Sequence, residues 1–333
     1  MIFTILAIFA TVVYVKFGID PIYEGLSSMP SSDSMLTMAS VSGLFFGMIN
    51  IIGNFGAVFV DQAYWQRAIA SKDSAASRAY IYGGISWFSI PFAIATFLGV
   101  SAAGLGITVG TPDSVAPEMA AHLLGGVGSI LFLAMLFMAV MSTGAAELTA
   151  ITNIIVTDIY RKSINPKASS DRLLNVSRKV TLGFGLMMGV LSILLFKVGI
   201  GLGWVYMAMG IFVSGAVIPV TLGLLWKKAT NEGTFYGASA GLVLGVTAWF
   251  TSAYLLFGEI SIRSLGELQS MFFGNITVFL VSGTISIGHA LMSNQEFDFE
   301  SLKGKFRSFD DEENDDEIIE EEIMYEGKQA SAK

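Results

Sequence analysis

The sequence predicts an all-α polytopic membrane protein. Of its 333 residues, 53% are hydrophobic and only 14% are charged, whereas soluble domains carry about 25% charged residues. The mean hydropathy is +0.65. Apolar runs close to the ~20 residues that a bilayer-spanning helix requires recur along the chain. These observations exclude an ordinary soluble globular domain.

Eight membrane helices are predicted from the apolar runs. The fourth run is longer than a bilayer requires, so we expect this helix to extend into the cytoplasm near Asp158. A short additional helix is expected between residues 115 and 123, in the loop before it. The eight predicted helices lie near residues 2–17, 39–65, 79–104, 127–158, 176–197, 201–226, 234–257 and 270–292.

The distribution of basic residues supports this count and predicts the orientation. Sixteen of the nineteen lysines and arginines fall in the even-numbered connections or in the C-terminal tail, and three (Lys16, Lys197 and Arg263) fall on the other side. Cytoplasmic loops carry the excess of basic residues. Both ends of the chain are therefore predicted to be cytoplasmic, and the plasma membrane is the expected location.

The chain divides into a transmembrane helical domain, residues 1–292, and an acidic tail, residues 293–333. The tail holds fourteen acidic and five basic residues, a balance of -9, so the remaining residues sum to +1 and the net charge of -8 is a property of the tail. Such a charge run repels itself and cannot bury a core. We expect a disordered, solvated tail, with a trafficking or regulatory role as the alternative.

The second helix, residues 40–65, is predicted to be interrupted at residues 53–56 (Gly-Asn-Phe-Gly). A Gly-interrupted membrane segment beside polar groups is a sequence pointer to a transporter binding site. Asp61 follows the interruption, and a carboxylate at membrane depth costs roughly 2.5–3.5 kcal/mol. It is expected to contact a solute or a proton, or alternatively to pair with Arg67 at the interface. Tyr64 and Trp65 are candidates for gating or for interface anchors.

The fourth helix carries a second group of polar residues. Ala139, Ser142 and Thr143 are spaced i, i+3 and i+4, so one carbonyl and two hydroxyls share a face and could bind a hard cation such as sodium. Alternatively, each hydroxyl bonds to the carbonyl four residues earlier. Glu147, one turn beyond Thr143, could relay a proton, attract a cation or make an interhelical hydrogen bond.

Glycines recur every four residues in the seventh helix, at positions 233, 237, 241 and 245. On a helix they form one stripe that allows a neighbouring backbone to approach closely. We interpret this stripe as helix packing.

Several functional classes are not supported by the sequence. The absence of cysteine excludes disulfides and thiolate metal sites, and the two histidines, His122 and His289, exclude a multi-histidine metal site. No nucleotide-binding glycine loop or Ser/His/Asp set is present, so no enzyme activity and no cofactor beyond a coupling ion are expected. Clustered, exposed basic surface is too sparse for nucleic-acid binding.

The sequence resembles the urea–proton symporter branch of the sodium:solute symporter family, the active urea transporters of fungi and plants. The resemblance runs colinearly through about residues 1–295. It is carried by residues 53–65 (GNFGAVFVDQAYW), 135–144 (MLFMAVMSTG), 158–161 (DIYR) with 164–166 (INP), and 202–210 (LGWVYMAMG).

The resemblance implies part of a LeuT-type fold of two inverted five-helix repeats, in which residues 53–56 unwind the first helix of the second repeat. Ala139, Ser142 and Thr143 match half of the family's cation site, whereas Asp61 and Tyr64 match solute-facing positions. Family members are about twice as long, and the first helices, including the partner unwound helix, are expected to be missing here.

Three functions remain open from the sequence. The first is proton- or sodium-coupled transport of urea or a similar small nitrogen solute across the bilayer, with Asn54, Asp61 and Glu147 of suitable chemistry and an N-terminal half as a possible partner. The second is a non-transporting membrane sensor or subunit. The third is a passive channel, in which an interrupted helix and a hydroxyl cluster would serve no evident purpose.

Overall fold

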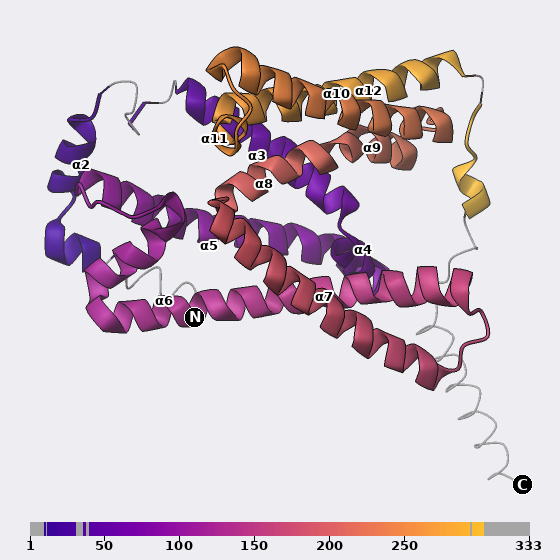
Figure 1. Cartoon of the computed structure of the whole chain (residues 1–333), viewed down its shortest axis with the longest axis horizontal. Helices are drawn as coiled ribbons and strands as arrows, with labels where there is room; N and C mark the ends of the chain where they lie inside the picture. Colours follow the sequence, from indigo (N-terminus) through magenta and orange to yellow (C-terminus); the bar gives the residue numbers. More distant parts are fainter. Residues whose placement is uncertain (1–9, 11, 31–35, 38–39, 294, 303–333) are drawn as a thin grey trace, which may run out of the picture.

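The computed structural model describes residues 10, 12–30, 36–37, 40–293 and 295–302, and these residues form helices and their connections (Figure 1). Seven of the described helical segments are long and apolar enough to cross a membrane. They span residues 41–60, 74–104, 112–164, 170–198, 202–225, 231–257 and 268–292. The predicted spans 39–65 to 270–292 are thereby confirmed, with shifted ends. The predicted helix 2–17 lies largely outside the described residues, as does most of the tail.

The element order is all helical in the described part of the chain. In sequence order the elements are α2 (Asp20–Ser27), α3 (Val41–Val60), α4 (Gln62–Ile69), α5 (Asp73–Gly104), η1 (Pro112–Ser114), α6 (Val115–Asn153), η2 (Ile154–Ile164), α7 (Ser170–Val198), α8 (Leu202–Val213), η3 (Ser214–Ala216), α9 (Val217–Leu225), α10 (Asn231–Phe257), α11 (Ile262–Gly266), α12 (Leu268–Met292) and η4 (Phe299–Leu302).

The break in the second predicted helix lies at Asp61, not at residues 53–56. The backbone stays helical through the glycines, and α3 ends where Asp61 becomes extended, with φ -73° and ψ 113°. The glycines serve close packing instead: a Cβ on Gly56 would lie 2.8 Å from the backbone nitrogen of Ser214, and one on Gly53 would lie 3.3 Å from the Cα of Gly210. Figure 1 shows α3 crossing α8 and α9.

α6 begins as a separate short helix, as predicted for residues 115–123. Gly125 interrupts it with φ 60° and ψ -147°, a backbone conformation that only glycine adopts readily. Beyond this kink the helix continues without a break into η2, a π-helical segment that ends at Ile164. The fourth membrane helix therefore extends past its predicted end at residue 158, to Ile164.

The glycine stripe of α10 packs against α12, and these two helices make the most extensive contact in the described structure. A Cβ on Gly237 would lie 2.2 Å from the Ser286 hydroxyl, and one on Gly245 would lie 2.0 Å from the Cγ2 of Val278. The packing interpretation is confirmed. Figure 1 shows the two helices side by side.

Two apolar cores hold the described helices together. The larger joins α5 and α6 with the N-terminal helical residues, and the other joins α3, α8, α10 and α12. The buried residues of the first are Val13, Ile94, Leu98, Ala102, Met119, Ala120, Leu123 and Phe132, and those of the second are Ile49, Ala208, Ile211, Trp249, Met271 and Val278. No residue of α7 is buried by the other described helices, and α7 contacts chiefly α6 and η2.

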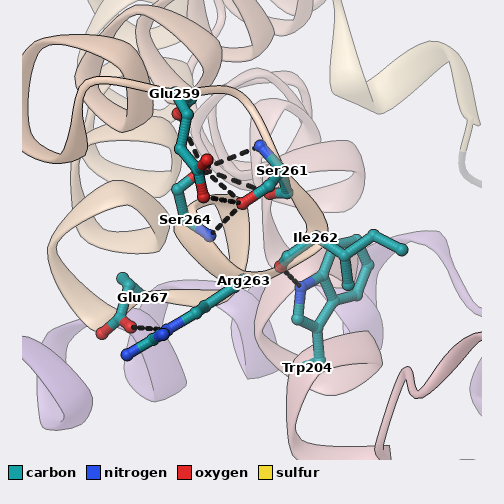
Figure 2. Close-up of polar contacts among 7 residues, drawn as sticks. All are labelled: Trp204, Glu259, Ser261, Ile262, Arg263, Ser264 and Glu267. Carbon is teal, nitrogen blue, oxygen red and sulfur yellow. Dashed lines mark hydrogen bonds and ion pairs between the residues drawn. The ribbon is translucent and has the colours of Figure 1, made fainter.

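The short helix α11, which the sequence did not predict, closes the connection between α10 and α12 (Figure 2). Ser261 and Ser264 form a capping box at its start: the backbone nitrogen of each lies within 3.2 Å of the hydroxyl oxygen of the other. The Trp204 indole donates to the Ile262 carbonyl at 3.0 Å, which attaches α11 to the beginning of α8. Helix α2, which begins at Asp20 and has Pro21 in its first turn, was also not predicted.

Candidate solute and ion site

Asp61 forms the junction between α3 and α4. Its carboxylate accepts a hydrogen bond from the Ala63 backbone N–H at 2.7 Å and thereby caps α4, which is a favoured use of aspartate because the first backbone N–H groups of a helix have no partner inside the helix. Across the same junction, the Trp65 indole donates to the Phe59 carbonyl at 3.0 Å. The backbone groups freed by the break are thus partly satisfied by side chains close in sequence.

α4 is anchored to the neighbouring helices through polar contacts. The Gln66 side chain donates to the Ala150 carbonyl of α6 at 3.3 Å and accepts from the Asn153 amide at 2.9 Å. From α5, the Tyr80 hydroxyl donates to the Tyr64 carbonyl at 2.6 Å. These contacts place α4 beside the last turns of α6, where Glu147 lies.

The carboxyl groups of Asp61 and Glu147 lie close enough to influence each other electrostatically. A hydrogen bond between two carboxyl groups requires that one of them carries a proton, since an ionised carboxylate only accepts. Arg67, in the last turn of α4, lies within electrostatic range of Glu147. It forms none of the ion pairs found among the described residues, so the alternative interpretation of Asp61 as an Arg67 partner is not supported.

Asn54 joins this group through a residue that sequence reasoning missed. The Tyr206 hydroxyl, from α8, donates to the Asn54 side-chain oxygen. Tyr206 also lies within electrostatic range of Tyr64, which in turn interacts with Asp61 and Glu147. We refer to Asn54, Asp61, Tyr64, Glu147 and Tyr206 as the polar cluster. It draws on α3, α4, α6, α8 and the junction between α3 and α4.

Trp65 lies at the edge of this cluster. Its indole N–H donates to the Phe59 carbonyl, so this polar atom has a structural role. Its ring is half-buried, so an apolar surface remains available there. Of the five predicted site residues of α3, α4 and α6, the structure therefore brings four together and leaves Trp65 beside them.

The comparison with known proteins identifies the family. Residues 2–241 match the model of the sodium:solute symporter family. The chain belongs to the sodium:solute symporter family. Within this family it is 43% identical over 298 residues to the urea-proton symporter DUR3 of Oryza sativa subsp. japonica, a match that covers 88% of this chain and 41% of that protein.

Two fungal proteins of the same group are similar as well. The urea active transporter of Saccharomyces cerevisiae is 33% identical over 282 residues, which cover 80% of this chain and 38% of the relative. The probable urea active transporter 1 of Schizosaccharomyces pombe is 31% identical over 297 residues, covering 85% and 45%. The chain thus spans about two fifths of the length of these relatives, which are transporters by name and not enzymes.

In this member of the symporter family, the predicted cation ligands Ala139, Ser142 and Thr143 lie together on α6 and are exposed. Neither hydroxyl makes a hydrogen bond to another described residue, whereas the Thr149 hydroxyl, two turns later, does donate to the carbonyl four residues before it, at 2.8 Å. The alternative of an ordinary backbone hydrogen bond is therefore not observed at residues 142 and 143. Three oxygen ligands from one helix fit a hard cation chemically but leave its coordination incomplete.

Acidic and histidine side chains of the described residues do not gather into a metal site. In the described part of the chain, no group of three or more histidine, aspartate or glutamate side chains could hold a metal ion. The polar cluster contributes two carboxyl groups, an amide and two phenol hydroxyls, which is a set suited to a small polar solute and a proton.

Proposed function

We propose that this chain is part of a secondary active transporter that carries urea, or a similar small nitrogen solute, coupled to protons. The observation that supports the proposal most strongly is the polar cluster, which gathers Asn54, Tyr206, Tyr64, Asp61 and Glu147 where α3 gives way to α4. Polar and ionisable groups in membrane helices are costly and typically mark solute or proton pathways.

The chemistry of the cluster suits urea. Urea offers one carbonyl acceptor and two amino groups that donate. When the Asn54 oxygen accepts from Tyr206, the Asn54 amino group remains able to donate to a carbonyl, and the carboxyl groups of Asp61 and Glu147 can accept from amino groups. The relatives named as urea transporters support this choice of solute.

The carboxyl pair supports proton coupling. We propose that Asp61 and Glu147, which lie within electrostatic range of each other, share one proton, because two such groups resist ionising together when like charges repel at short distance. Loss of the shared proton changes the charge beside the solute position, so proton binding and solute binding are expected to be coupled. The DUR3 relative is named as a urea-proton symporter, which agrees with this choice.

Transport requires that the cluster is exposed alternately to the two sides of the membrane. We propose that it does so by relative movement of helix groups about a site near the bilayer midplane, as in transporters built from inverted repeats. Because the matched relatives are about twice as long, further helices of the kind they contain, such as an N-terminal half, are proposed as partners in forming the complete site.

We propose that the chain spans the plasma membrane with its C-terminus in the cytoplasm. The six connections between the seven described spans alternate between two sides, and the side that carries Arg67, Arg161, Lys167 and Lys227 holds most of the basic residues. The excess of basic residues marks the cytoplasmic side.

The test is uptake of labelled urea into yeast cells that lack their own urea transporter. The chain is expressed alone and together with the N-terminal half of the rice relative, at acidic and alkaline pH, with and without sodium. Uptake that requires the added half and rises at acidic pH is the expected result. No uptake in any combination, despite surface expression, would contradict a transport function and favour a sensor or subunit.

Sodium coupling is separated from proton coupling by the hydroxyl pair on α6. The double substitution Ser142→Ala/Thr143→Ala removes two of the three candidate cation ligands, and with proton coupling urea uptake at acidic pH should fall less than twofold. The matched control is Thr149→Ala, whose hydroxyl already has a backbone partner. A sodium-dependent uptake that the double substitution abolishes and the control preserves would contradict proton coupling.

A further inference from the structure

The turn between α6 and α7 is a concentrated basic surface. We define the basic turn as residues 158–179, which hold six basic and two acidic residues, a balance of +4. All six basic side chains are exposed. They are Arg161, Lys162, Lys167, Arg172, Arg178 and Lys179.

Most of this charge is not neutralised within the described structure. Lys162 pairs with Asp158 at 2.6 Å, and Arg172 donates to the Tyr160 hydroxyl at 2.9 Å. The other four basic side chains make no ion pair or hydrogen bond with a described residue. Two of them, Arg178 and Lys179, directly precede the apolar part of α7, so this positive surface begins at the membrane boundary.

The acidic tail leaves the helical domain on the same side. Figure 1 shows the turn between α6 and α7 and the end of α12 at the same side of the molecule, at the right of the view. After α12 the backbone N–H of Phe297 donates to the Lys227 carbonyl at 2.7 Å, so the described chain passes the connection between α9 and α10 before it reaches η4.

The charge of the tail complements the basic turn. Residues 310–326 contain eleven acidic residues and no basic residue. Only seven residues, 303–309, separate this segment from the end of η4, and seven residues span at most about 25 Å. A short tether gives a segment an effective concentration of about a millimolar or more near its own domain.

We propose that residues 310–326 bind to the basic turn, so that the tail forms an intramolecular contact with the connection between α6 and α7. Anionic lipid headgroups would meet the same surface, but the tail is tethered beside it and carries nearly three times the charge needed to neutralise it. This proposal does not depend on the solute or ion that the protein carries, because it rests on charge and position alone.

A cysteine-free chain allows a direct measurement of this contact. The purified full-length chain carries spin labels at Ser163→Cys, an exposed residue of the basic turn, and at Asn314→Cys in the acidic segment. Distances between the labels are measured by electron–electron double resonance in nanodiscs of phosphatidylcholine. The control pair is Asn231→Cys, an exposed residue at the start of α10 on the same side, with Asn314→Cys.

We expect a short, narrow distance distribution for the 163–314 pair and a broader one for the 231–314 pair. Exchanging the seven acidic residues between 310 and 317 for their amides should broaden the 163–314 distribution. Raising the salt concentration to about 1 M should do the same, because the electrostatic screening length then falls to roughly 3 Å. A 163–314 distribution as broad as the control, and unchanged by either treatment, would overturn the proposal. The amide variant lies outside the membrane helices, so failure to fold cannot account for its result.

Discussion

Trp204 and Trp249 hold the same short helix from two directions. Their ring centroids lie 5.7 Å apart, and each indole donates to a carbonyl of α11, that of Ile262 at 3.0 Å and that of Leu265 at 2.8 Å. Because Trp204 belongs to α8 and Trp249 to α10, the connection that carries α11 is attached to both helices. Gly266 allows this contact: a Cβ there would lie 2.4 Å from the Trp204 ring.

Trp249→Phe should loosen α11. The substitution keeps most of the ring packing but leaves the Leu265 carbonyl without its donor, which costs about 1–2 kcal/mol. Amide hydrogen exchange of residues 258–267 in the purified chain is expected to accelerate, and the melting temperature to fall. Trp87→Phe is the control, because Trp87 is 73% exposed. Equal effects of both substitutions would contradict the role of the indole hydrogen bond.

Gly56→Val should destabilise the packing of α3 against η3. A Cβ at this position meets the backbone of Val213 and Ser214 at 2.8 Å, and overpacking of this kind costs about 1–3 kcal/mol. Gly47→Val is the matched control, since a Cβ on Gly47 meets no atom within 4 Å and both positions lie in the same helix. Thermal unfolding in detergent should distinguish them, and similar melting temperatures would show that Gly56 is not a packing glycine.

Asp61→Asn and Glu147→Gln should each reduce urea uptake without a comparable loss of stability. Asparagine is as good an N-cap as aspartate, so the Ala63 N–H keeps its acceptor while the ionisable group is lost. A hydrogen bond to a charged group is worth about 1.5–3 kcal/mol, so uptake should fall roughly tenfold or more. Its dependence on pH should also weaken.

The control for the carboxyl pair is Glu232→Gln, which removes an exposed carboxylate in the first turn of α10. Uptake is measured with the N-terminal half of the rice relative present. If Asp61→Asn and Glu147→Gln retained both the rate and the pH dependence shown by Glu232→Gln, the carboxyl pair would have no part in coupling.

Tyr206→Phe should raise the KM for urea. The substitution removes the donor to the Asn54 side-chain oxygen and frees the amide to rotate, at a cost of about 1 kcal/mol or a roughly fivefold higher KM. Maximal uptake and surface expression should change little. Tyr254→Phe, in which an exposed hydroxyl of α10 is removed, should leave the KM unchanged. A lower surface level with an unaltered KM would instead indicate a purely structural tyrosine.

The membrane helices could be predicted from the sequence because their signal is local. An apolar run of sufficient length identifies a span whatever it packs against. The short helix before Gly125 and the long span after it differ in composition, so the sequence separates them as clearly as the backbone kink does. The glycines of α10 repeat at one period and have one plausible use, so their contact with α12 could be anticipated as well.

The position of the helix break could not be predicted in the same way. Glycines at residues 53–56 either end a helix or permit a close neighbour, and only the presence of Gly210 and Ser214 on α8 and η3 decides between these uses. The true junction at Asp61 depends on side chains that satisfy the freed backbone, among them the Trp65 indole. Such compensation is visible only once the helices are placed.

Tyr206 was missed because nothing near it in the chain indicates a polar role. It lies in an apolar run, and its partner Asn54 is 152 positions away. Conversely, Asn54, Asp61 and Glu147 could be proposed from their chemistry, because each is a polar residue in an otherwise apolar helix. Their assembly into one cluster depends on how α4 is anchored to α6, which has no local signature.

The glycine contact between α10 and α12 has a mechanical consequence. Gly237, Gly241 and Gly245 face the α12 backbone at close range, so the pair is expected to move as one rigid body. The helical hydrogen-bond ladder is interrupted at the extended residue Asp61 and at the 3₁₀ turn Ser214–Ala216. Ser214 packs against Gly56, five residues before Asp61, so bending is expected to concentrate in this region. Hydrogen exchange faster at residues 57–64 and 213–219 than in α10 would reveal it.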